Sequence, residues 1–398
     1  MADTKKQGFR TVSNQDKMEY QRKIQEHRMK VLKQTVIAAI VVLLLVGGTA
    51  LYMSLRLYVD YDVLVSAERA DTKATKFVEF QGNILKYSND GASYTKHDNE
   101  MIWNQTYEMS NPTVDVCGSY VAIYDKKGKD IYILNKNGLL QGIETNYPIT
   151  QVSIAGQGTI AVLMDNQSKG ILNLYDKEGN LLVNGAIHGE KGGYPVAIAL
   201  SDDAIKLGVT MLDIKEGVVK STLAFYNFGT VGENAIDHIV SVMTYDDMFI
   251  SELDFVSKDC MLAIGDTGIL VFEGSQTPKE SAFVAFEEKV KSVFHNNNYV
   301  GIISASNDEA GCDIIRVYDF RGKVVMEESI DITYTNLTLL GSNEVCISER
   351  NRCDIYTIRG IHKFHYEFDK ELHGVITEGS GLNYTFILSG VTEQVRLK

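Results

Sequence analysis

The stretch IYILNKNGLL (131–140) contains the pattern that decides the fold. Apolar and polar residues alternate on both sides of a short polar turn, which is typical of two β-strands joined by a hairpin. The turn closes at Gly138, and glycine readily supplies the positive φ angle that a tight hairpin needs. The same unit recurs as LNLYDKEGNLL (172–182) and IRVYDFRGKVV (315–325), so the hairpin is an internal repeat.

The repeat continues through most of the chain at a regular spacing. Weaker copies end at Gly229, Gly274 and Gly360, and an equivalent turn is expected near Asn99. Consecutive turn positions lie 38–50 residues apart, which leaves room for two further strands in each interval. Four strands per repeat of about 40–50 residues are typical of a β-propeller blade. We therefore predict an all-β propeller with units at approximately 77–111, 112–147, 148–192, 193–248, 249–289, 290–334, 335–372 and 373–398.

The last unit has room for three strands only, so its outer strand must come from the start of the domain. KFVEF (76–80) and DVLVS (62–66) are both candidates. A ring closed in this way removes the free strand edges that otherwise invite aggregation. If KFVEF closes the ring, the first unit loses its own inner strand, so eight blades and seven blades both remain open.

An apolar run precedes the repeats. Residues 35–55 contain no charged side chain, and about 20 helical residues cross a hydrocarbon core of about 30 Å. We therefore predict a basic cytoplasmic tail (1–34), a transmembrane signal-anchor helix in the lipid bilayer (35–56), an extracytoplasmic tether (57–75) and the propeller (76–398). The rival interpretation is a signal peptide that is cleaved at Gly48-Thr49-Ala50, but the long basic region before the apolar run favours an uncleaved anchor.

Charge is divided unequally between the two sides of the apolar run. Residues 1–56 carry ten Lys/Arg and four Asp/Glu, whereas the remainder carries 29 Lys/Arg and 48 Asp/Glu, a net charge of −19. Because basic flanks stay on the cytoplasmic side, the N-terminus is expected in the cytoplasm and the large C-terminal part outside it, in a single-pass topology at the cell membrane. The acidic outer part argues against nucleic acid as a partner, since phosphate binding needs a basic face.

Five cysteines at irregular spacing do not form a disulfide framework. Cys346 and Cys353 flank ISERNR and would face each other if Arg350 lies at a hairpin tip. A cross-strand disulfide and two free thiols both remain open.

No catalytic, cofactor-binding or metal-binding motif stands out, and we predict no enzyme activity, no cofactor and no metal. His362 and His365 are three residues apart, and in a regular strand such residues point to opposite faces. On that basis they are not expected to bind one ion.

The combination of a basic tail, one membrane helix and blades reading YVAIYDKKGKDIYILNKNG (120–138) resembles a family of uncharacterised membrane-anchored β-propeller proteins of Gram-positive bacteria. More distantly, the chain is similar to the quinoprotein-like and outer-membrane-assembly propellers, whose blades end in Gly-x-x-x-Trp. DNEMIW (98–103) keeps only Trp103 of that motif, with Asn99 where glycine would stand, which argues against a quinone cofactor. The resemblance implies structural motifs and no catalytic residue.

The prediction for function is a binding or scaffold module for an envelope protein or glycan. The long fourth unit contains Asp202, Asp203, Asp246 and Asp247, which we expect to form a contact surface. One alternative is a polysaccharide hydrolase or lyase with carboxylates in the propeller funnel as acid and base. The other is the outer sensor domain of a signalling assembly.

Overall fold

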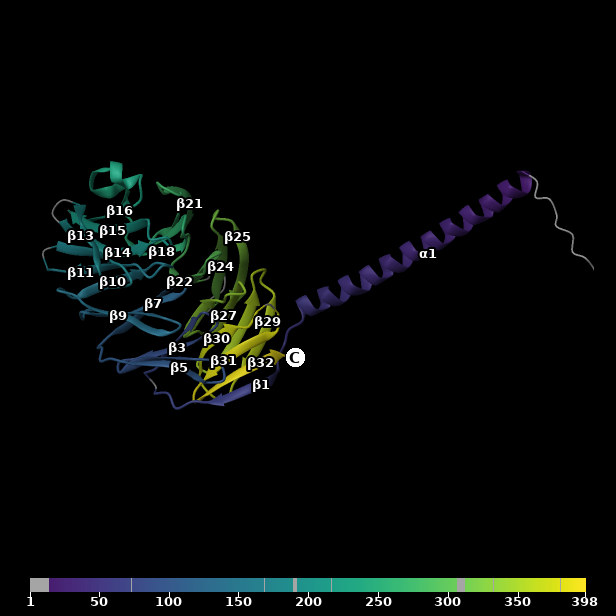
Figure 1. Cartoon of the computed structure of the whole chain (residues 1–398), viewed down its shortest axis with the longest axis horizontal. Helices are drawn as coiled ribbons and strands as arrows, with labels where there is room; N and C mark the ends of the chain where they lie inside the picture. The colour runs from purple at the N-terminus through teal and green to yellow at the C-terminus, as the bar shows by residue number, and fades with distance from the viewer. Residues whose placement is uncertain are drawn as a thin grey trace, which may run out of the picture. The chain divides into compact units, whose positions relative to one another are not determined.

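The computed structural model describes residues 14–72, 74–167, 169–188, 192–215, 217–305, 312–331, 333–379 and 381–398. The described residues form two compact units, one up to Arg56 and the other from Leu57 to Lys398. The second unit consists of eight four-stranded antiparallel sheets that follow one another in chain order (Figure 1). The predicted fold class, an eight-bladed β-propeller of four-stranded blades, is confirmed.

The first unit is a single long helix, α1 (Asn14–Leu55). The segment Lys17–Thr49 contains an 18-residue window with a mean hydropathy of 2.2, and the helix is long and apolar enough to cross a membrane. Two threonines within the helix satisfy their hydroxyl groups internally, because Thr35 Oγ1 donates to the Val31 carbonyl and Thr49 Oγ1 to the Leu45 carbonyl. A helix of this kind is typical of signal anchors and also of signal sequences.

Each blade consists of four sequential strands, except the last. Blades one to four contain β2 (Lys76–Phe80), β3 (Asn83–Ser88), β4 (Gly91–Thr95) and β5 (Met101–Thr106); β6 (Pro112–Cys117), β7 (Tyr120–Asp125), β8 (Asp130–Asn135) and β9 (Gly138–Glu144); β10 (Ile149–Ile154), β11 (Ile160–Asp165), β12 (Lys169–Tyr175) and β13 (Leu181–His188); and β14 (Tyr194–Leu200), β15 (Lys206–Lys215), β16 (Val218–Asn227) and β17 (Ile239–Asp246). Two short 3₁₀ helices, η1 (Gly232–Asn234) and η2 (Ile236–His238), interrupt the last turn of blade four. Blades five to seven contain β18 (Ile250–Ser257), β19 (Cys260–Gly265), β20 (Gly268–Glu273) and β21 (Lys279–Ala285); β22 (Val290–His295), β23 (Tyr299–Ala305), β24 (Asp313–Asp319) and β25 (Val324–Ile330); and β26 (Asn336–Leu339), β27 (Glu344–Glu349), β28 (Arg352–Thr357) and β29 (His362–Glu367). The first strands of neighbouring blades contact one another, so they lie innermost in the ring.

Blade eight combines the two ends of the propeller unit. Its first three strands are β30 (Leu372–Thr377), β31 (Asn383–Leu388) and β32 (Val391–Leu397), and its outer strand is β1 (Tyr61–Glu68). The register runs from Tyr61 opposite Leu397 to Glu68 opposite Val391. DVLVS therefore closes the ring, and KFVEF is the inner strand of blade one. The segment 57–75, expected to be a tether, thus contains the strand that closes the propeller.

The three clearest copies of the predicted turn adopt the expected conformation, whereas Gly229, in a weaker copy, does not have a positive φ angle. Gly138, Gly179 and Gly322 have positive φ angles of 115°, 85° and 78° at the turn before the outer strand. Asn99 takes the equivalent place in blade one with a φ of 65°, as its position in the repeat predicted. A second shared feature is a register shift between the third and fourth strands, which recurs in each of blades one to seven. This β-bulge places one extra residue on the outer strand.

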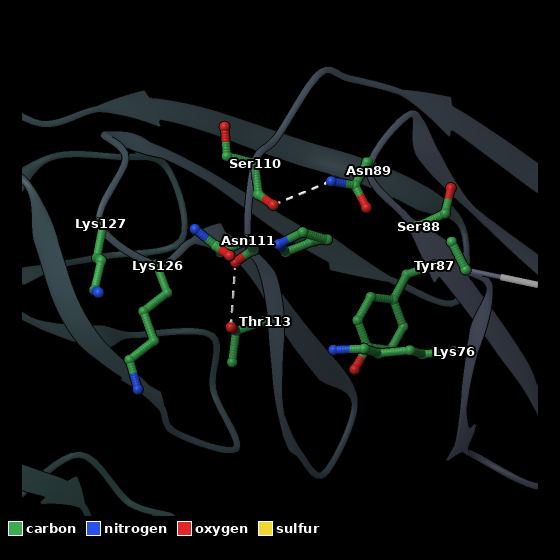
Figure 2. Close-up of a pocket in the computed structure, with 11 residues that line it drawn as sticks. Lys76, Tyr87, Ser88, Asn89, Ser110, Asn111, Thr113, Lys126 and Lys127 are labelled. Atoms are coloured by element: carbon green, nitrogen blue, oxygen red, sulfur yellow. Dashed lines mark hydrogen bonds between the residues drawn. The ribbon is translucent and has the colours of Figure 1, made fainter.

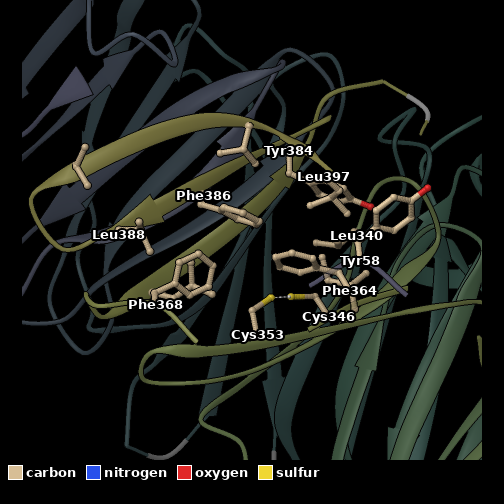
Figure 3. Close-up of a cluster of buried hydrophobic side chains, with 14 residues drawn as sticks. Tyr58, Leu340, Cys346, Cys353, Phe364, Phe368, Tyr384, Phe386, Leu388 and Leu397 are labelled. Atoms are coloured by element: carbon tan, nitrogen blue, oxygen red, sulfur yellow. Dashed lines mark hydrogen bonds between the residues drawn. The ribbon is translucent and has the colours of Figure 1, made fainter. Parts of the chain in front are cut away.

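The core lies between the faces of neighbouring blades. Figure 3 shows the cluster between blades seven and eight, where Phe364 and Phe386 stack with ring centroids 5.7 Å apart. Tyr58, three residues beyond the end of α1, is buried in the same cluster. Its backbone N–H donates to the Lys363 carbonyl (2.8 Å), so the segment before β1 is tied to blade seven as well.

Candidate functional site

The four aspartates predicted as a contact surface lie at opposite ends of blade four. Asp202 and Asp203 occupy the turn between β14 and β15, whereas Asp246 ends the outer strand β17 and Asp247 follows it, near the β15–β16 hairpin. The antiparallel pairing of β15 with β16 separates these two regions by the length of the blade. The four residues therefore do not form one surface.

Three of these aspartates have local structural partners. Asp203 Oδ1 accepts a hydrogen bond from Ser201 Oγ (2.6 Å), which closes its turn. Asp246 lies 3.6 Å from Lys220 Nζ. Asp247 adopts a left-handed backbone conformation with a φ of 57° where the strand ends, and its backbone N–H donates to the Val219 carbonyl (2.8 Å). These contacts explain the three residues as parts of the fold.

Asp202 belongs instead to a group of titratable side chains gathered around the axis of the ring. Its Oδ1 lies 3.6 Å from Cys117 Sγ of blade two, which donates to it. The negative charge of Asp254 in blade five acts on Asp115 in blade two, although these blades are not neighbours, so the interaction runs across the axis. We call this group the axial cluster, and it comprises Asp115 and Cys117 of β6, Asp202, Glu252 and Asp254 of β18, and His295 of β22.

Asp115 has an unusually basic carboxyl group. Burial raises the pKa of Asp115 to about 6, the hydrogen bond from the Ile154 N–H (2.7 Å) opposes that change, and the charge of Asp254 adds to it. A carboxyl group with this pKa changes its charge in the physiological range of pH.

Asp254, Glu252 and His295 form the other side of the cluster. The two imidazole nitrogens of His295 lie 3.6 Å from Asp254 Oδ2 and 3.9 Å from Glu252 Oε1. Burial lowers the pKa of His295, but the nearby carboxylates of Glu252 and Asp254 raise it above the ordinary value. Desolvation by the surrounding protein raises the pKa of Asp254, although 48% of its side-chain surface is exposed to solvent. Solvent contact together with desolvation by surrounding protein is typical of a concave surface.

The axial cluster carries an excess of negative charge. Four carboxyl groups face a single imidazole, and the Cys117 thiol stays neutral because burial and the nearby aspartates raise its pKa to about 12. Such a group attracts cations and hydrogen-bond donors. Sequence reasoning predicted only Asp202 among these residues. The available signal was an aspartate between two large apolar residues on an inner strand, Asp115 between Val114 and Val116 and Asp254 between Leu253 and Phe255.

A cleft between blades one and two has the opposite character. It has a volume of about 530 Å³ and is lined by polar side chains and three lysines, Lys76, Lys126 and Lys127 (Figure 2). Asn89 Nδ2 donates to the Ser110 carbonyl (3.0 Å) across the cleft. Pro112, at the start of β6, lines this cleft, whereas Cys117 of the axial cluster ends the same strand. This cleft, lined by Lys76, Lys126 and Lys127, and the axial cluster therefore lie toward opposite ends of blade two.

The expectation that His362 and His365 point to opposite faces of their strand is wrong. The bulge on β29 shifts the register, so that His365 lies opposite Asp354 while His362 lies opposite Tyr356. Both imidazoles therefore reach the same carboxylate oxygen, Asp354 Oδ1, at 3.0 Å from His362 Nε2 and 2.9 Å from His365 Nδ1. These three residues form a group that could hold a metal ion.

Cys346 and Cys353 are both free thiols in this structure, with their sulfur atoms 3.7 Å apart (Figure 3). Cys353 lies opposite Ser348 rather than opposite Cys346, so the two cysteines are diagonal neighbours on the hairpin. The hydrogen bond with Cys346, together with burial, raises the pKa of Cys353 well above its ordinary value. A thiol of this kind reacts slowly, because the thiolate is the reactive form.

The fold and these sites define the chain as an eight-bladed β-propeller with one long apolar N-terminal helix. It belongs to a family of unknown function, DUF5711, whose model matches residues 54–397. No curated protein matches the chain. Among solved structures it is similar to BamB from Moraxella catarrhalis, with 12% identity and a TM-score of 0.52 over 85% of this chain and 100% of that one. It is also similar to Saccharomyces cerevisiae Sqt1, with 11% identity and a TM-score of 0.52 over 86% and 98% of the two chains. At such identities these likenesses establish the fold alone.

Proposed function

We propose that this chain is a membrane-anchored binding or scaffold module of the cell envelope. In this proposal α1 is an uncleaved anchor in the cytoplasmic membrane, the N-terminus is cytoplasmic, and the propeller is extracytoplasmic. The length and hydropathy of α1 support the anchor, and the nine Lys/Arg that precede Thr35 support the orientation. The rigid ring supports a role in recognition, because its loops and inner strands can present side chains without rearranging the scaffold.

The axial cluster indicates what kind of partner the propeller binds in this proposal. Its carboxylates converge from blades two, four and five, and a single imidazole balances them. The imidazole of His295, 3.9 Å from Glu252 Oε1, lowers the pKa of Glu252, which remains ionised at neutral pH. The chemistry favours a cationic ligand, and we infer that a segment of an envelope protein bearing lysine or arginine binds there.

One observation favours an enzyme as the second candidate. Asp115 and Asp254 interact, and both have raised pKa values, a property expected of a general acid in polysaccharide cleavage. This candidate predicts that the purified protein cleaves envelope polysaccharide and that Asp115→Asn abolishes the cleavage. Cleavage retained by that variant would remove Asp115 from the reaction.

Photo-crosslinking in intact cells tests the binding proposal. A photoreactive residue replaces Gln157, which is exposed in the turn next to Gly156, whose N–H donates to the Asp202 carbonyl (2.8 Å). The control probe replaces Ile214, which is exposed at the far end of blade four. We expect the Gln157 probe to capture one dominant envelope protein and the Ile214 probe to capture it much less.

Charge neutralisation then separates recognition from mere proximity. The double variant Asp202→Asn, Asp254→Asn keeps the side-chain shapes and removes two negative charges, so capture at the Gln157 probe should fall at least tenfold. Capture that is independent of these charges, or equal from both probe positions, would contradict a cationic partner at the axial cluster. Crosslinks to glycan alone would replace the protein partner by a glycan.

A further inference from the structure

We propose that Asp354, His362 and His365 bind a divalent transition-metal cation of the zinc class on the outer half of blade seven. The three potential ligand atoms, Asp354 Oδ1, His362 Nε2 and His365 Nδ1, all lie within 4.8 Å of one another. In a tetrahedral site with bonds of about 2.0–2.1 Å, neighbouring ligand atoms lie about 3.3 Å apart. Modest rotations of the two imidazoles would therefore complete the coordination.

The donor set suits this class of ion. Two imidazole nitrogens and one carboxylate oxygen are typical ligands of zinc and of neighbouring first-row metals, whereas calcium and magnesium prefer oxygen ligands alone. Three protein ligands leave a fourth position for water or for a group supplied by a partner. The site shares no residue with the axial cluster, so it is independent of the proposed binding function.

The surroundings hold the ligands in place. Arg352 Nε donates to Asp354 Oδ2 (2.7 Å), which leaves Oδ1 for the cation. The ring of Tyr356 stacks on His362 with centroids 4.5 Å apart and an interplanar angle of 10°. The Asp354 side chain is fully buried, whereas those of His362 and His365 are 33% and 35% exposed. A cation could therefore reach a carboxylate that is already oriented.

The other blades provide an internal comparison, because they share the bulge without sharing these residues. The register-equivalent residues in blades one to six are Ser93, Met101 and Asn104; Tyr132, Leu139 and Gly142; Asn173, Leu181 and Asn184; Ala224, Ile239 and Val242; Leu270, Glu280 and Phe283; and Arg316, Val324 and Glu327. None of these six sets offers three metal ligands. The bulge is thus part of the architecture, whereas the convergence of three ligands at it is specific to blade seven.

The position of the site gives a bound ion a structural consequence. It would tie β28 to β29 where the segment before β1 joins the ring. The backbone N–H of His365 donates to the Tyr58 carbonyl (3.0 Å). A metal ion that fixes His365 would therefore also fix the beginning of the propeller unit. Because an ion that binds only the folded state stabilises it by mass action, zinc should raise the unfolding midpoint.

The test uses the full chain in detergent micelles, purified without a polyhistidine tag and stripped with a chelator. Zn²⁺ is titrated by calorimetry, and Co²⁺ is added separately for its visible absorption. We expect one Zn²⁺ per chain and a Co²⁺ spectrum of a site with nitrogen and oxygen ligands. Single variants His362→Gln and His365→Asn should each weaken Zn²⁺ binding by about tenfold or more.

Blade three supplies the matched negative control. The triple variant Asp354→Asn, His362→Leu, His365→Asn reproduces the blade-three residues at a position where this chain already accommodates them. It should keep the Trp103 fluorescence of the folded chain and lose both zinc binding and zinc stabilisation. His295→Ala, in the axial cluster, should leave binding unchanged.

Three results would overturn the proposal. They are absence of Zn²⁺ binding by the unaltered chain, undiminished binding by the triple variant or by both single variants, and loss of binding in His295→Ala alone. The last result would move the metal to the axial cluster.

Discussion

Replacing Asp115 by asparagine should stabilise the protein at alkaline pH and leave its stability nearly unchanged in acid. The introduced amide would keep an oxygen that can accept the Ile154 N–H bond, so the substitution mainly removes a charge. The buried carboxyl group is easier to protonate in the folded state, with a pKa of about 6, than in the unfolded chain, where it is close to 3.8.

The magnitude follows from this difference in pKa. A carboxyl group whose pKa is raised by folding opposes folding once it ionises, so the wild-type chain loses stability as pH rises from about 4 to about 6 and no more above that. The difference of about 2 pKa units corresponds to roughly 3 kcal/mol, because each unit is worth about 1.4 kcal/mol. The variant escapes that loss and should gain up to roughly 3 kcal/mol at pH 8.

Urea unfolding of the full chain in detergent measures this gain. Trp103 is the only tryptophan, and its Nε1 donates to the Asn135 carbonyl (3.1 Å) between blades one and two, so its fluorescence reports the relevant part of the ring. The midpoints are compared at pH 4 and pH 8, with the exposed Asp90→Asn as a control that should shift neither. A variant no more stable than wild type at pH 8, or equally stabilised at both pH values, would refute the reasoning.

Three further outcomes are expected from the core and the interfaces between blades. Phe386 is buried, and Phe386→Ala should lower the free energy of unfolding by about 3–5 kcal/mol, as measured by urea unfolding. Phe283 is exposed, and Phe283→Ala should change that free energy little. Cys346 and Cys353 should both be alkylated after unfolding without a reductant, and mass spectrometry showing either unmodified would contradict the thiol state. Lys206→Ala removes a buried ammonium that pairs with a carboxylate of blade five at 3.1 Å, and should cost about 1–3 kcal/mol in the same urea assay.

The architecture was largely predictable because each blade repeats one hairpin with one special backbone position. Gly138 and Asn99 adopt the predicted left-handed turns, and the eight units follow the spacing of those turns. The identity of the closing strand was not decidable. Outer strands such as DVLVS are largely exposed, so they lack the clear burial pattern that would distinguish them from a polar linker.

The candidate sites were much less predictable, because they depend on geometry that sequence periodicity does not contain. Asp115 and Asp254 are 139 positions apart and interact only because the ring brings the inner strands of blades two and five to the same axis. His362 and His365 violate the alternation rule because a bulge adds one residue to the outer strand. That bulge recurs in seven blades, so a repeat-wide alignment of the hairpins would have been the signal to look for.

The pairing of β1 with β32 also determines when this protein can finish folding. Tyr61 of β1 pairs with Leu397 of β32, so β1 can complete its sheet only after β32 has been synthesised. Contacts between such distant residues form slowly, and until then β1 has no partner. On the proposed topology β1 emerges from the membrane long before β32 does, and a chain that lacks β32 cannot seal the ring. Ring closure therefore distinguishes chains that contain β32 from chains that lack it. In chains that lack β32, the unpaired edge of β1 would be exposed to envelope chaperones and proteases.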